Sequence, residues 1–448
     1  MKKLAAFAGV FSLALLALAS SEPNAEAERF WPQWRGPLMT GVAPHGNPPV
    51  EWSETKNVRW KVEIPGKGSA TPVVWGDRIF VQTAVPTGKR VTEAAAEDNG
   101  SARPQRGGPR GIQPEEELEF MLMAFARADG KLLWQKVLRK ELPHEGTHPT
   151  GTWASNSPVT DGEMVYAYFG SRGLYALDLD GNLKWEKDLG DMTIRLGFGE
   201  GASPALYGDR LIINWDHEGE SFIVALDKRT GKELWRTGRD EMTSWTTPLV
   251  VPHNGRAQVV TSATGKIRSY DAETGKLLWE SEGVTLNAIP TPVSSGGIVY
   301  ATSGFRGNKL FAIRLDGAQG NLAETDAILW RFDRDTPYVP SPLLYDGRLY
   351  FLKSNSAIVS CFDARTGKPH YGPERLEGLT DVYASPVGAA GRVYIFGRDG
   401  AGAVLAHGPE MKVLAVNRLE DGFDASPAIV GSEMYLRGKK FLYRISEK

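Results

Sequence analysis

Cysteine is almost absent from the 448-residue chain, which has only Cys361. A single cysteine excludes an intramolecular disulfide, a multi-cysteine zinc site, an iron–sulfur cluster and a covalently attached c-type haem. An excess of one charge is also lacking, because 52 Lys and Arg residues stand against 54 Asp and Glu residues. Without a net positive field, nucleic acid is not an expected partner.

Long hydrophobic runs are lacking outside the N-terminus. The apolar run at residues 4–19 follows Met-Lys-Lys and is short for a bilayer span, which is typical of a signal peptide. Ala25-Glu26-Ala27 offers a cleavage site. We therefore expect a signal peptide at residues 1–27 and export of a soluble protein to the periplasm or the exterior, with an uncleaved anchor as the alternative. No cysteine follows the run, so we do not expect a lipoprotein, and no later run predicts a transmembrane segment.

Turn-forming and aromatic residues are abundant: the chain has 50 Gly, 28 Pro, 13 Trp, 14 Tyr and 17 Phe. This composition suits short strands joined by tight turns and excludes an all-helical protein. A Ser/Thr-Pro pair followed by a short apolar strand recurs about every 45 residues, which is typical of a four-stranded propeller blade. The eight pairs begin at Thr71, Ser157, Ser203, Thr247, Thr291, Ser341, Ser385 and Ser426.

A tryptophan recurs on the last strand of most units. At a fixed place on the outer strand, a large aromatic ring most simply fills the seam against the next unit. We therefore predict a structural role for these residues, which are Trp60, Trp134, Trp185, Trp235, Trp279 and Trp330.

The last unit leaves room for only three strands before the C-terminus, whereas residues 58–64 look like an isolated outer strand. We predict an all-β fold at residues 58–448: an eight-bladed β-propeller of four-stranded antiparallel blades, closed by the N-terminal strand. A seven-bladed ring or an open solenoid is the alternative. Residues 28–57 are expected to form an extended arm, and the Gly/Pro-rich, charged stretch at 86–118 a disordered insertion.

The repeat at residues 225–235, Ala-Leu-Asp-x-x-Thr-Gly-Lys-x-x-Trp, resembles those of the PQQ-like (quinoprotein-type) β-propeller superfamily. The resemblance extends from Val58 to the end and implies the fold more strongly than a function. The superfamily includes quinoprotein alcohol dehydrogenases and also the non-catalytic propeller of the outer-membrane β-barrel assembly machinery. In Trp-Pro-Gln-Trp-Arg-Gly-Pro at 31–37, the chain most resembles exported bacterial propeller proteins whose activity is not established.

Two connections between blades are longer than the rest, and they carry charged and aromatic residues. In a propeller these connections share one face with the loops that join second to third strands, whereas the repetitive Gly-Asp-Arg and Thr-Gly-Lys turns lie on the other. Irregular loops are the usual place for ligand contacts. The predicted ligand-binding residues are His144, His148, Trp153, Arg195, Glu200, Asn214, Asp216, His217, Glu218, Trp245, Arg306, Arg334 and Asp335.

His144-Glu-Gly-Thr-His148 matches the H-E-x-x-H pattern, but Pro143, Gly146 and Pro149 argue against the helix that a zinc protease needs. A divalent-cation site remains open, with Glu200, Asp216 and His217 as candidate ligands. The favoured interpretation is that these groups form salt bridges and hydrogen bonds that tie long loops together.

The first functional hypothesis is a monomeric binding or scaffolding module that holds a protein, peptide or saccharide on its loop face, with no catalytic residue, metal or cofactor assigned. The alternative, implied by the resemblance, is a PQQ- and Ca²⁺-dependent oxidoreductase acting on alcohols or sugars. In that case Trp245 or Trp153 would be the stacking indole, Glu200 and Asn214 ligands, and Asp216 or Asp335 the base. The adjacent cysteines of such enzymes are missing. A third hypothesis, a glycoside hydrolase, would need two carboxylates at a set distance from each other in the fold, and sequence spacing does not give that distance.

Overall fold

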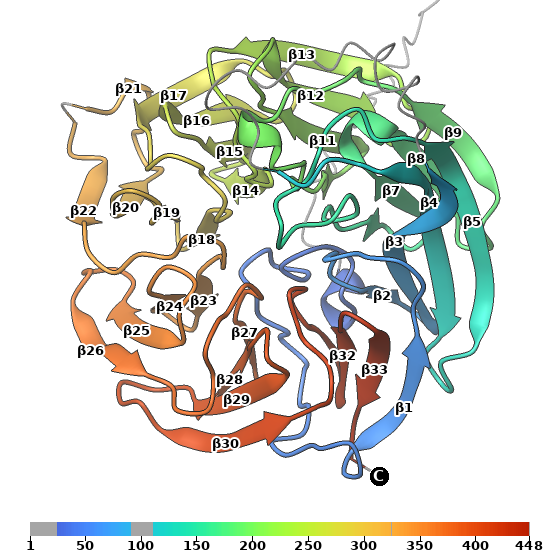
Figure 1. Cartoon of the computed structure of the whole chain (residues 1–448). Helices are drawn as coiled ribbons and strands as arrows, with labels where there is room; N and C mark the ends of the chain where they lie inside the picture. Colours follow the sequence, from blue (N-terminus) through green and yellow to red (C-terminus); the bar gives the residue numbers. More distant parts are fainter. Residues whose placement is uncertain (1–24, 91–110, 324, 448) are drawn as a thin grey trace, which may run out of the picture.

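Eight β-sheets radiate from a central axis in the computed structural model, which describes residues 25–90, 111–323 and 325–447 (Figure 1). Each sheet contains four antiparallel strands, and one carries a fifth, parallel strand. The predicted eight-bladed β-propeller is therefore confirmed. The predicted signal peptide lies almost wholly outside the described residues.

Blades 1 to 4 follow one another along the chain. Blade 1 contains β2 (Val73–Trp75), β3 (Arg78–Arg90), β4 (Glu116–Ala126) and β5 (Leu132–Glu141); blade 2 contains β6 (Val159–Thr160), β7 (Met164–Tyr168), β8 (Leu174–Asp178) and β9 (Leu183–Lys187). Blade 3 contains β10 (Ala205–Tyr207), β11 (Arg210–Trp215), β12 (Ser221–Asp227) and β13 (Glu233–Arg239); blade 4 contains β14 (Leu249–His253), β15 (Arg256–Ser262), β16 (Lys266–Asp271), β17 (Leu277–Glu282) and the added β21 (Gly320–Asn321).

Blades 5 to 8 complete the ring. Blade 5 contains β18 (Val293–Ser295), β19 (Ile298–Ser303), β20 (Lys309–Arg314) and β22 (Ile328–Phe332); blade 6 contains β23 (Leu343–Tyr345), β24 (Arg348–Leu352), β25 (Ile358–Asp363) and β26 (Pro369–Arg375). Blade 7 contains β27 (Val387–Ala389), β28 (Arg392–Phe396), β29 (Ala401–Ala406) and β30 (Val413–Arg418); blade 8 contains β31 (Ala428–Val430), β32 (Glu433–Arg437), β33 (Phe441–Ile445) and β1 (Val58–Glu63). The described residues also form three short 3-10 helices: η1 (Ala27–Arg29) precedes β1, whereas η2 (Gly170–Arg172) and η3 (Arg195–Gly197) lie in connections between strands.

Strand β1 closes the ring by pairing antiparallel with β33, in a register that places Trp60 opposite Arg444 and Glu63 opposite Phe441. The N-terminal strand therefore completes the last blade, as predicted. Closure pairs strands from the two ends of the chain and covers the edge of β33 that would otherwise be open.

The predicted disordered insertion at residues 86–118 is too broad. Strand β3 continues to Arg90 and β4 begins at Glu116, and the ladder pairs Pro86 with Leu118 and Arg90 with Glu116. The Gly/Pro-rich and charged composition was averaged over the whole segment, so the strand residues at its two ends were not recognised. Residues 91–110 lie outside the described residues.

The Ser/Thr-Pro pairs connect each blade to the next by a hydrogen bond from blade 1 to blade 8. The Thr71 N–H donates to Ser157 Oγ over 3.0 Å, and the Ser157 N–H donates to Ser203 Oγ over 2.9 Å. The same link continues from Ser203 to Thr247, Thr291, Ser341, Ser385 and Ser426 at 2.9–3.0 Å. All these hydroxyl-bearing residues are buried. The repeat residue is thus a clasp between neighbouring inner strands.

The repeated tryptophans lie at the seams between blades. The indoles of Trp60, Trp134, Trp185, Trp235 and Trp330 each donate to a backbone carbonyl of the following blade, namely Arg127, Leu179, Lys228, Ala272 and Ala364. Trp279 differs, because its indole donates to Gln258 within its own blade. Strand β21, which comes from the turn of the following blade, pairs beside Trp279 and replaces the usual contact.

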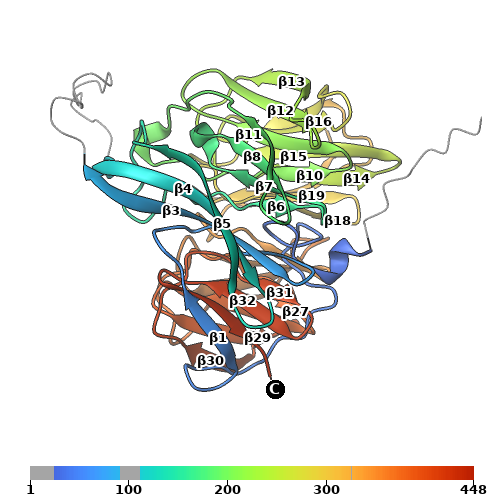
Figure 2. The same ribbon diagram turned by 90° about the vertical axis from the view of Figure 1, so that its right-hand side faces the viewer.

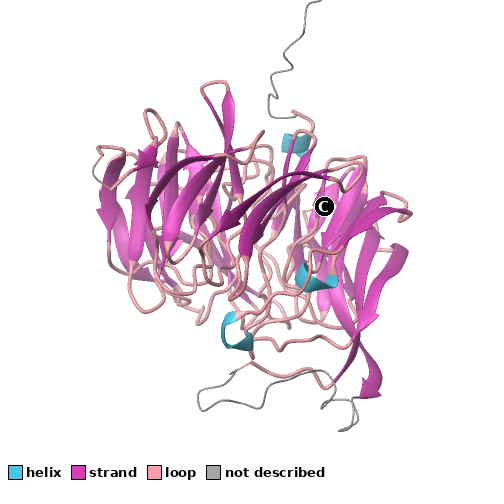
Figure 3. Ribbon diagram, turned by 90° about the horizontal axis from the view of Figure 1, so that it is seen from above, coloured by secondary structure: helices cyan, strands magenta, loops and turns pink. Residues whose placement is uncertain are grey.

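The N-terminal arm crosses the middle of the ring (blue in Figure 1). Its backbone bonds to Val74 in blade 1, to Leu344 in blade 6 and to Gly388 in blade 7. Figure 2 shows η1 at one face of the disc and the ends of β3 and β4 projecting from the opposite face. The arm therefore crosses the ring axis on the side that carries the tight turns, and the irregular loops lie on the other side (Figure 3).

Candidate functional site

A cavity of about 210 Å³ lies on the ring axis at the loop face. All eight connections that lead into the inner strands contribute to its wall. One position does this in every unit, the residue two places before the Ser/Thr of each Ser/Thr-Pro pair. These residues are Ser69, Ser155, Gly201, Trp245, Ile289, Val339, Tyr383 and Asp424.

The wall of this central cavity is aromatic and rich in hydroxyl groups. Trp34 reaches it from the N-terminal arm, and Phe198, Trp245, Tyr338 and Tyr383 line it from the loops. The hydroxyl-bearing residues include Thr147, Thr150, Ser155 and Ser385. A concave, largely apolar site with a few convergent polar groups is the usual form of a ligand pocket.

Three of the predicted ligand-binding residues, His148, Glu200 and Trp245, line the cavity. Trp245 donates its indole N–H to Gly199 O over 2.7 Å, which fixes the ring. His148 Nδ1 lies 2.7 Å from Thr150 Oγ1, and its ring meets Phe198 edge-on. Burial, with a smaller contribution from Arg398, lowers the pKa of His148 below the usual value, so the imidazole is neutral at pH 7.

Glu200, in the cavity wall, is held by several hydrogen-bond donors. Its carboxylate accepts hydrogen bonds of 2.6 Å from Ser171 N–H and Ser171 Oγ, and Arg172 Nη1 lies 3.7 Å away. Burial raises the pKa of Glu200, and Arg172 and Ser171 oppose this rise by stabilising the ionised form. A carboxylate with these partners has a structural role in shaping the wall.

The backbone of residues 192–194 is hydrogen-bonded to other predicted site residues, His144 and His217, and to Glu145. His144 Nε2 lies 2.8 Å from Met192 O, and Thr193 N–H donates to His217 Nδ1 over 3.0 Å. Ile194 N–H donates to the Glu145 carboxylate over 2.9 Å. These groups lie close together because they tie two long connections to each other, and none of them lines the central cavity.

Arg195, Glu218 and Trp153 also hold loops in place. Thr243 donates to the Glu218 carboxylate and accepts from the Arg195 N–H, while the Trp153 indole donates to Glu145 O over 3.0 Å. Arg306, Arg334 and Asp335 lie elsewhere on the loop face and do not line the cavity. The two arginines are exposed, and Asp335 forms an ion pair of 2.8 Å with Lys353.

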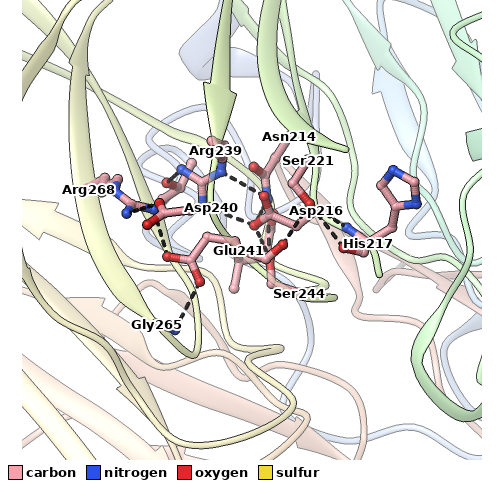
Figure 4. Close-up of polar contacts among 12 residues, drawn as sticks. Asn214, Asp216, His217, Ser221, Arg239, Asp240, Glu241, Ser244, Gly265 and Arg268 are labelled. Atoms are coloured by element: carbon pink, nitrogen blue, oxygen red, sulfur yellow. Dashed lines mark hydrogen bonds and ion pairs between the residues drawn. The ribbon is translucent and has the colours of Figure 1, made fainter. Parts of the chain in front are cut away.

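Asp216 lies in a buried ionic network (Figure 4). Arg239 donates to both of its oxygens, over 2.6 and 3.0 Å, and both side chains are fully buried. Ser244 and Asn214 add two donors to the same carboxylate. Both carboxylate oxygens of Asp216 therefore accept hydrogen bonds, and Arg239 balances the negative charge. This arrangement does not suit the catalytic base or metal ligand considered from the sequence.

A second buried arginine extends this network. Arg268 pairs with Glu241 over 2.7 Å and also with Asp240 (Figure 4). Burial raises the pKa of Glu241, against the effect of Arg239 and Arg268. The residues therefore brace blades 3 and 4 behind the loops.

Several cavity residues were missed by sequence reasoning: Trp34, Phe198, Tyr338, Tyr383 and Asp424. Asp424 pairs with Arg398 Nε over 2.5 Å, and the Arg398 guanidinium lies 4.2 Å from the Tyr383 ring centre. The fixed offset from the repeat Ser/Thr could have identified Tyr383 and Asp424. No repeat-based signal marks Trp34, because the arm lies outside the repeat.

The residues considered for PQQ and Ca²⁺ do not fit those groups. Asp216 is neutralised by Arg239, and the Asn214 amide N–H points at Asp216. Cys361 is buried and alone in β25, where burial raises its pKa to about 11. Within the described part of the chain, no group of three or more His, Cys, Asp and Glu residues is arranged to hold a metal ion.

A family model described as outer membrane protein assembly factor BamB (PQQ_2) matches residues 118–218 and 219–446. The chain belongs to this family. Outer membrane protein assembly factor BamB of Yersinia pestis is 25% identical over 255 residues. That alignment covers 54% of this chain and 58% of the Yersinia protein, so it spans little more than half of either length.

Solved structures agree on the fold. BamB from Moraxella catarrhalis covers 87% of this chain and 97% of its own at a TM-score of 0.55 and 14% identity. Quinohemoprotein alcohol dehydrogenase from Comamonas testosteroni covers 94% of this chain and 81% of its own at a TM-score of 0.62 and 11% identity. Both are PQQ-like β-propellers, and at these identities the likeness concerns the fold alone. In the residues placed by the structure, no helix is long and apolar enough to span a bilayer.

Proposed function

We propose that this member of the BamB family is an exported binding or scaffolding module that holds a protein or peptide segment in the central cavity of its loop face. The observation that carries the proposal is the cavity wall, which combines aromatic rings with several hydroxyl groups. Aromatic rings offer large, rigid contact areas, and hydroxyl groups adapt to the donors and acceptors of a polypeptide.

The state of the acidic groups supports binding over catalysis. The two carboxylates of the cavity are both engaged, Glu200 with Ser171 and Arg172 and Asp424 with Arg398. A general acid or base must be free to exchange a proton with a substrate. An oxidoreductase is not favoured, because the residues considered for its cofactor are used to brace the loops.

The proposal extends to location and assembly. The apolar run at residues 4–19 and the absence of a following cysteine favour release of a mature, unlipidated protein into the periplasm or the exterior. A ring that is closed by the pairing of β1 with β33 has no exposed end unit as an open solenoid would, which favours a monomer.

The test uses the mature chain from Glu28, panned against a peptide library, with affinities of recovered synthetic peptides measured by fluorescence anisotropy. We expect saturable binding that Tyr383→Ala and His148→Ala weaken at least about tenfold, as expected for contacts at the centre of an interface. Lys276→Gln, on the opposite face, is the matched control and should bind like the wild type. Native mass spectrometry with added PQQ and Ca²⁺ forms the second arm. Stoichiometric retention of PQQ, or peptide binding unchanged in both cavity variants, would contradict the proposal.

A further inference from the structure

A second pocket, of about 280 Å³, opens beside the central cavity where blades 7, 8 and 1 meet. Its lining comes from the connection that enters blade 1, from the long connection at residues 149–152, and from the loops after β28 and β32. The charged residues of the lining are Lys67, Arg398, Asp424, Arg437 and Lys439. Four cations thus surround one anion.

Arg437 has no partner in this pocket. Its side chain is only 1% exposed, and Nε, Nη1 and Nη2 are all buried without a hydrogen bond among the described residues. The nearby Asp421 favours the charged form of Arg437, but its oxygens accept from the N–H groups of Lys440 and Phe441. Burial lowers the pKa of Arg437 to about 10, which still leaves the guanidinium charged at neutral pH.

The other buried arginines show that this situation is unusual in the described residues. Arg35 donates to backbone carbonyls, Arg172 pairs with Glu141, Arg239 with Asp216 and Arg268 with Glu241. A buried charge without a partner is costly, and a buried group left unsatisfied in a folded protein calls for an unseen water or ion. Among the buried arginines that the structure describes, Arg437 is therefore the one whose guanidinium has neither a hydrogen bond nor an ion pair.

The remaining cations of the pocket are Arg398 and two lysines. Asp424 is bound to Arg398, so this pair is close to neutral. Lys67 and Lys439 are exposed at the rim and form no ion pair with any residue that the structure describes. The pocket consequently combines a buried planar guanidinium with two exposed ammonium groups.

We propose that this pocket binds an oxyanion, a carboxylate or a phosphate group, with Arg437 as its buried anchor and Lys67 and Lys439 at the entrance. A guanidinium presents parallel N–H donors that match the two oxygens of either group, and such charge-assisted bonds are stronger than neutral ones. The lysines act as compact charges that attract the anion to the mouth of the pocket.

The anion pocket shares Ser69, Thr150, Gly151 and Asp424 with the central cavity. A ligand that carries an oxyanion close to an aromatic group can therefore occupy both spaces at once. Benzoate tests this feature, since it adds a ring to the carboxylate of acetate. The anion site itself stands independently of the peptide-binding proposal, because it is probed with small ions alone.

The experiment titrates the mature chain with inorganic phosphate, acetate and benzoate in a low-salt buffer, using isothermal calorimetry and the shift of the thermal midpoint. A ligand that binds only the folded state raises that midpoint in a concentration-dependent manner. We expect saturable binding of phosphate or of a carboxylate, and the preferred ion identifies the chemical source. Arg437→Gln should weaken binding at least about tenfold, and Lys439→Gln about threefold, in line with the loss of one charge-assisted contact or one rim charge.

Lys276→Gln is the matched control, because it removes one positive charge from the turn face and should bind as the wild type does. If Arg437→Gln fails to fold, Lys439→Gln and Lys67→Gln at the exposed rim carry the same test. No saturable binding of any of the three ions would overturn the proposal, as would equal binding by the wild type and the rim variants. Peptide binding that persists without anion binding would overturn the anion site and leave the proposed function intact.

Discussion

Arg35 Nη2 lies 2.6 Å from the carbonyl oxygen of Pro342, although 307 positions separate the two residues. Nη1 donates to Pro386 O over 2.9 Å, and Nη2 also reaches Thr40 O. Pro342 and Pro386 belong to the Ser/Thr-Pro pairs that precede the inner strands of blades 6 and 7. One side chain of the arm is thus bonded to two repeat units, and the arm that carries Trp34 into the cavity is part of the folded ring.

Arg35→Ala is expected to destabilise the whole ring. It leaves the carbonyls of Pro342 and Pro386 buried without a donor, which should lower the free energy of unfolding by about 2 kcal/mol or more. Urea denaturation followed by tryptophan fluorescence measures the change. Arg229→Ala, on an exposed turn, is the control and should change stability little. An unchanged midpoint for Arg35→Ala would mean that the arm contributes nothing to the cooperative unit.

Asp216→Asn separates a bracing role from a catalytic one. The substitution keeps the shape of the side chain but leaves the buried Arg239 without its counter-charge, which should cost about 3–5 kcal/mol. Differential scanning calorimetry should show a clearly lowered midpoint, whereas Asp209→Asn, at an exposed turn, should not. A variant as stable as the wild type would contradict the bracing role and reopen the possibility of a reactive carboxylate.

The periodic parts of the chain were predictable, because blades repeat the same local chemistry. The Ser/Thr-Pro spacing gave eight units, and the leftover strand at 58–64 gave the closure that pairs β1 with β33. The same spacing also marks the ring of cavity residues, since the position two places before each repeat Ser or Thr, such as Tyr383 or Trp245, lines the cavity.

The nonperiodic parts depended on contacts that sequence spacing does not reveal. In the sequence, Asp216 belongs to a charged loop and is a candidate for a reactive carboxylate. Its ion pair with Arg239, 23 positions away, becomes visible only in the fold. Trp279 fits the repeat, but strand β21 from a longer turn changes its partner. Arg437 ends an ordinary strand, and its isolation follows from three blades meeting around it.

Gly170→Ala tests whether η2 holds Glu200 in place. Gly170 has a φ of +61°, and an added Cβ would lie 1.4 Å from Glu200 Oε2, so the carboxylate would have to leave Ser171. Gly208→Ala is a matched control, since that glycine has a φ of +56° and open space around it. The control should lose about 1 kcal/mol from backbone strain, and Gly170→Ala at least about 2 kcal/mol more. Equal losses in urea titrations would show that Glu200 is not held there.

Glu145 provides a prediction on the pH dependence of stability. Burial raises its pKa above the usual value, and the hydrogen bond from Ile194 opposes the rise only in part. The folded state therefore holds this proton more tightly than the unfolded state. The resulting stabilisation is complete below the unfolded-state pKa, near 4.5, and is lost as the pH rises through the folded-state pKa.

Glu145→Gln removes this titration while Gln Oε1 can still accept from Ile194. The stability of the variant relative to the wild type should therefore increase as the pH rises from about 4.5 towards neutrality. Glu51→Gln is a control with the opposite sign. The hydrogen bond and ion pair with Lys56 lower the pKa of Glu51, so ionised Glu51 stabilises the folded state and the stability of this variant relative to the wild type should fall as the pH rises. Chemical denaturation at a series of pH values gives both differences. A flat difference for Glu145→Gln would show that burial does not disfavour its charge.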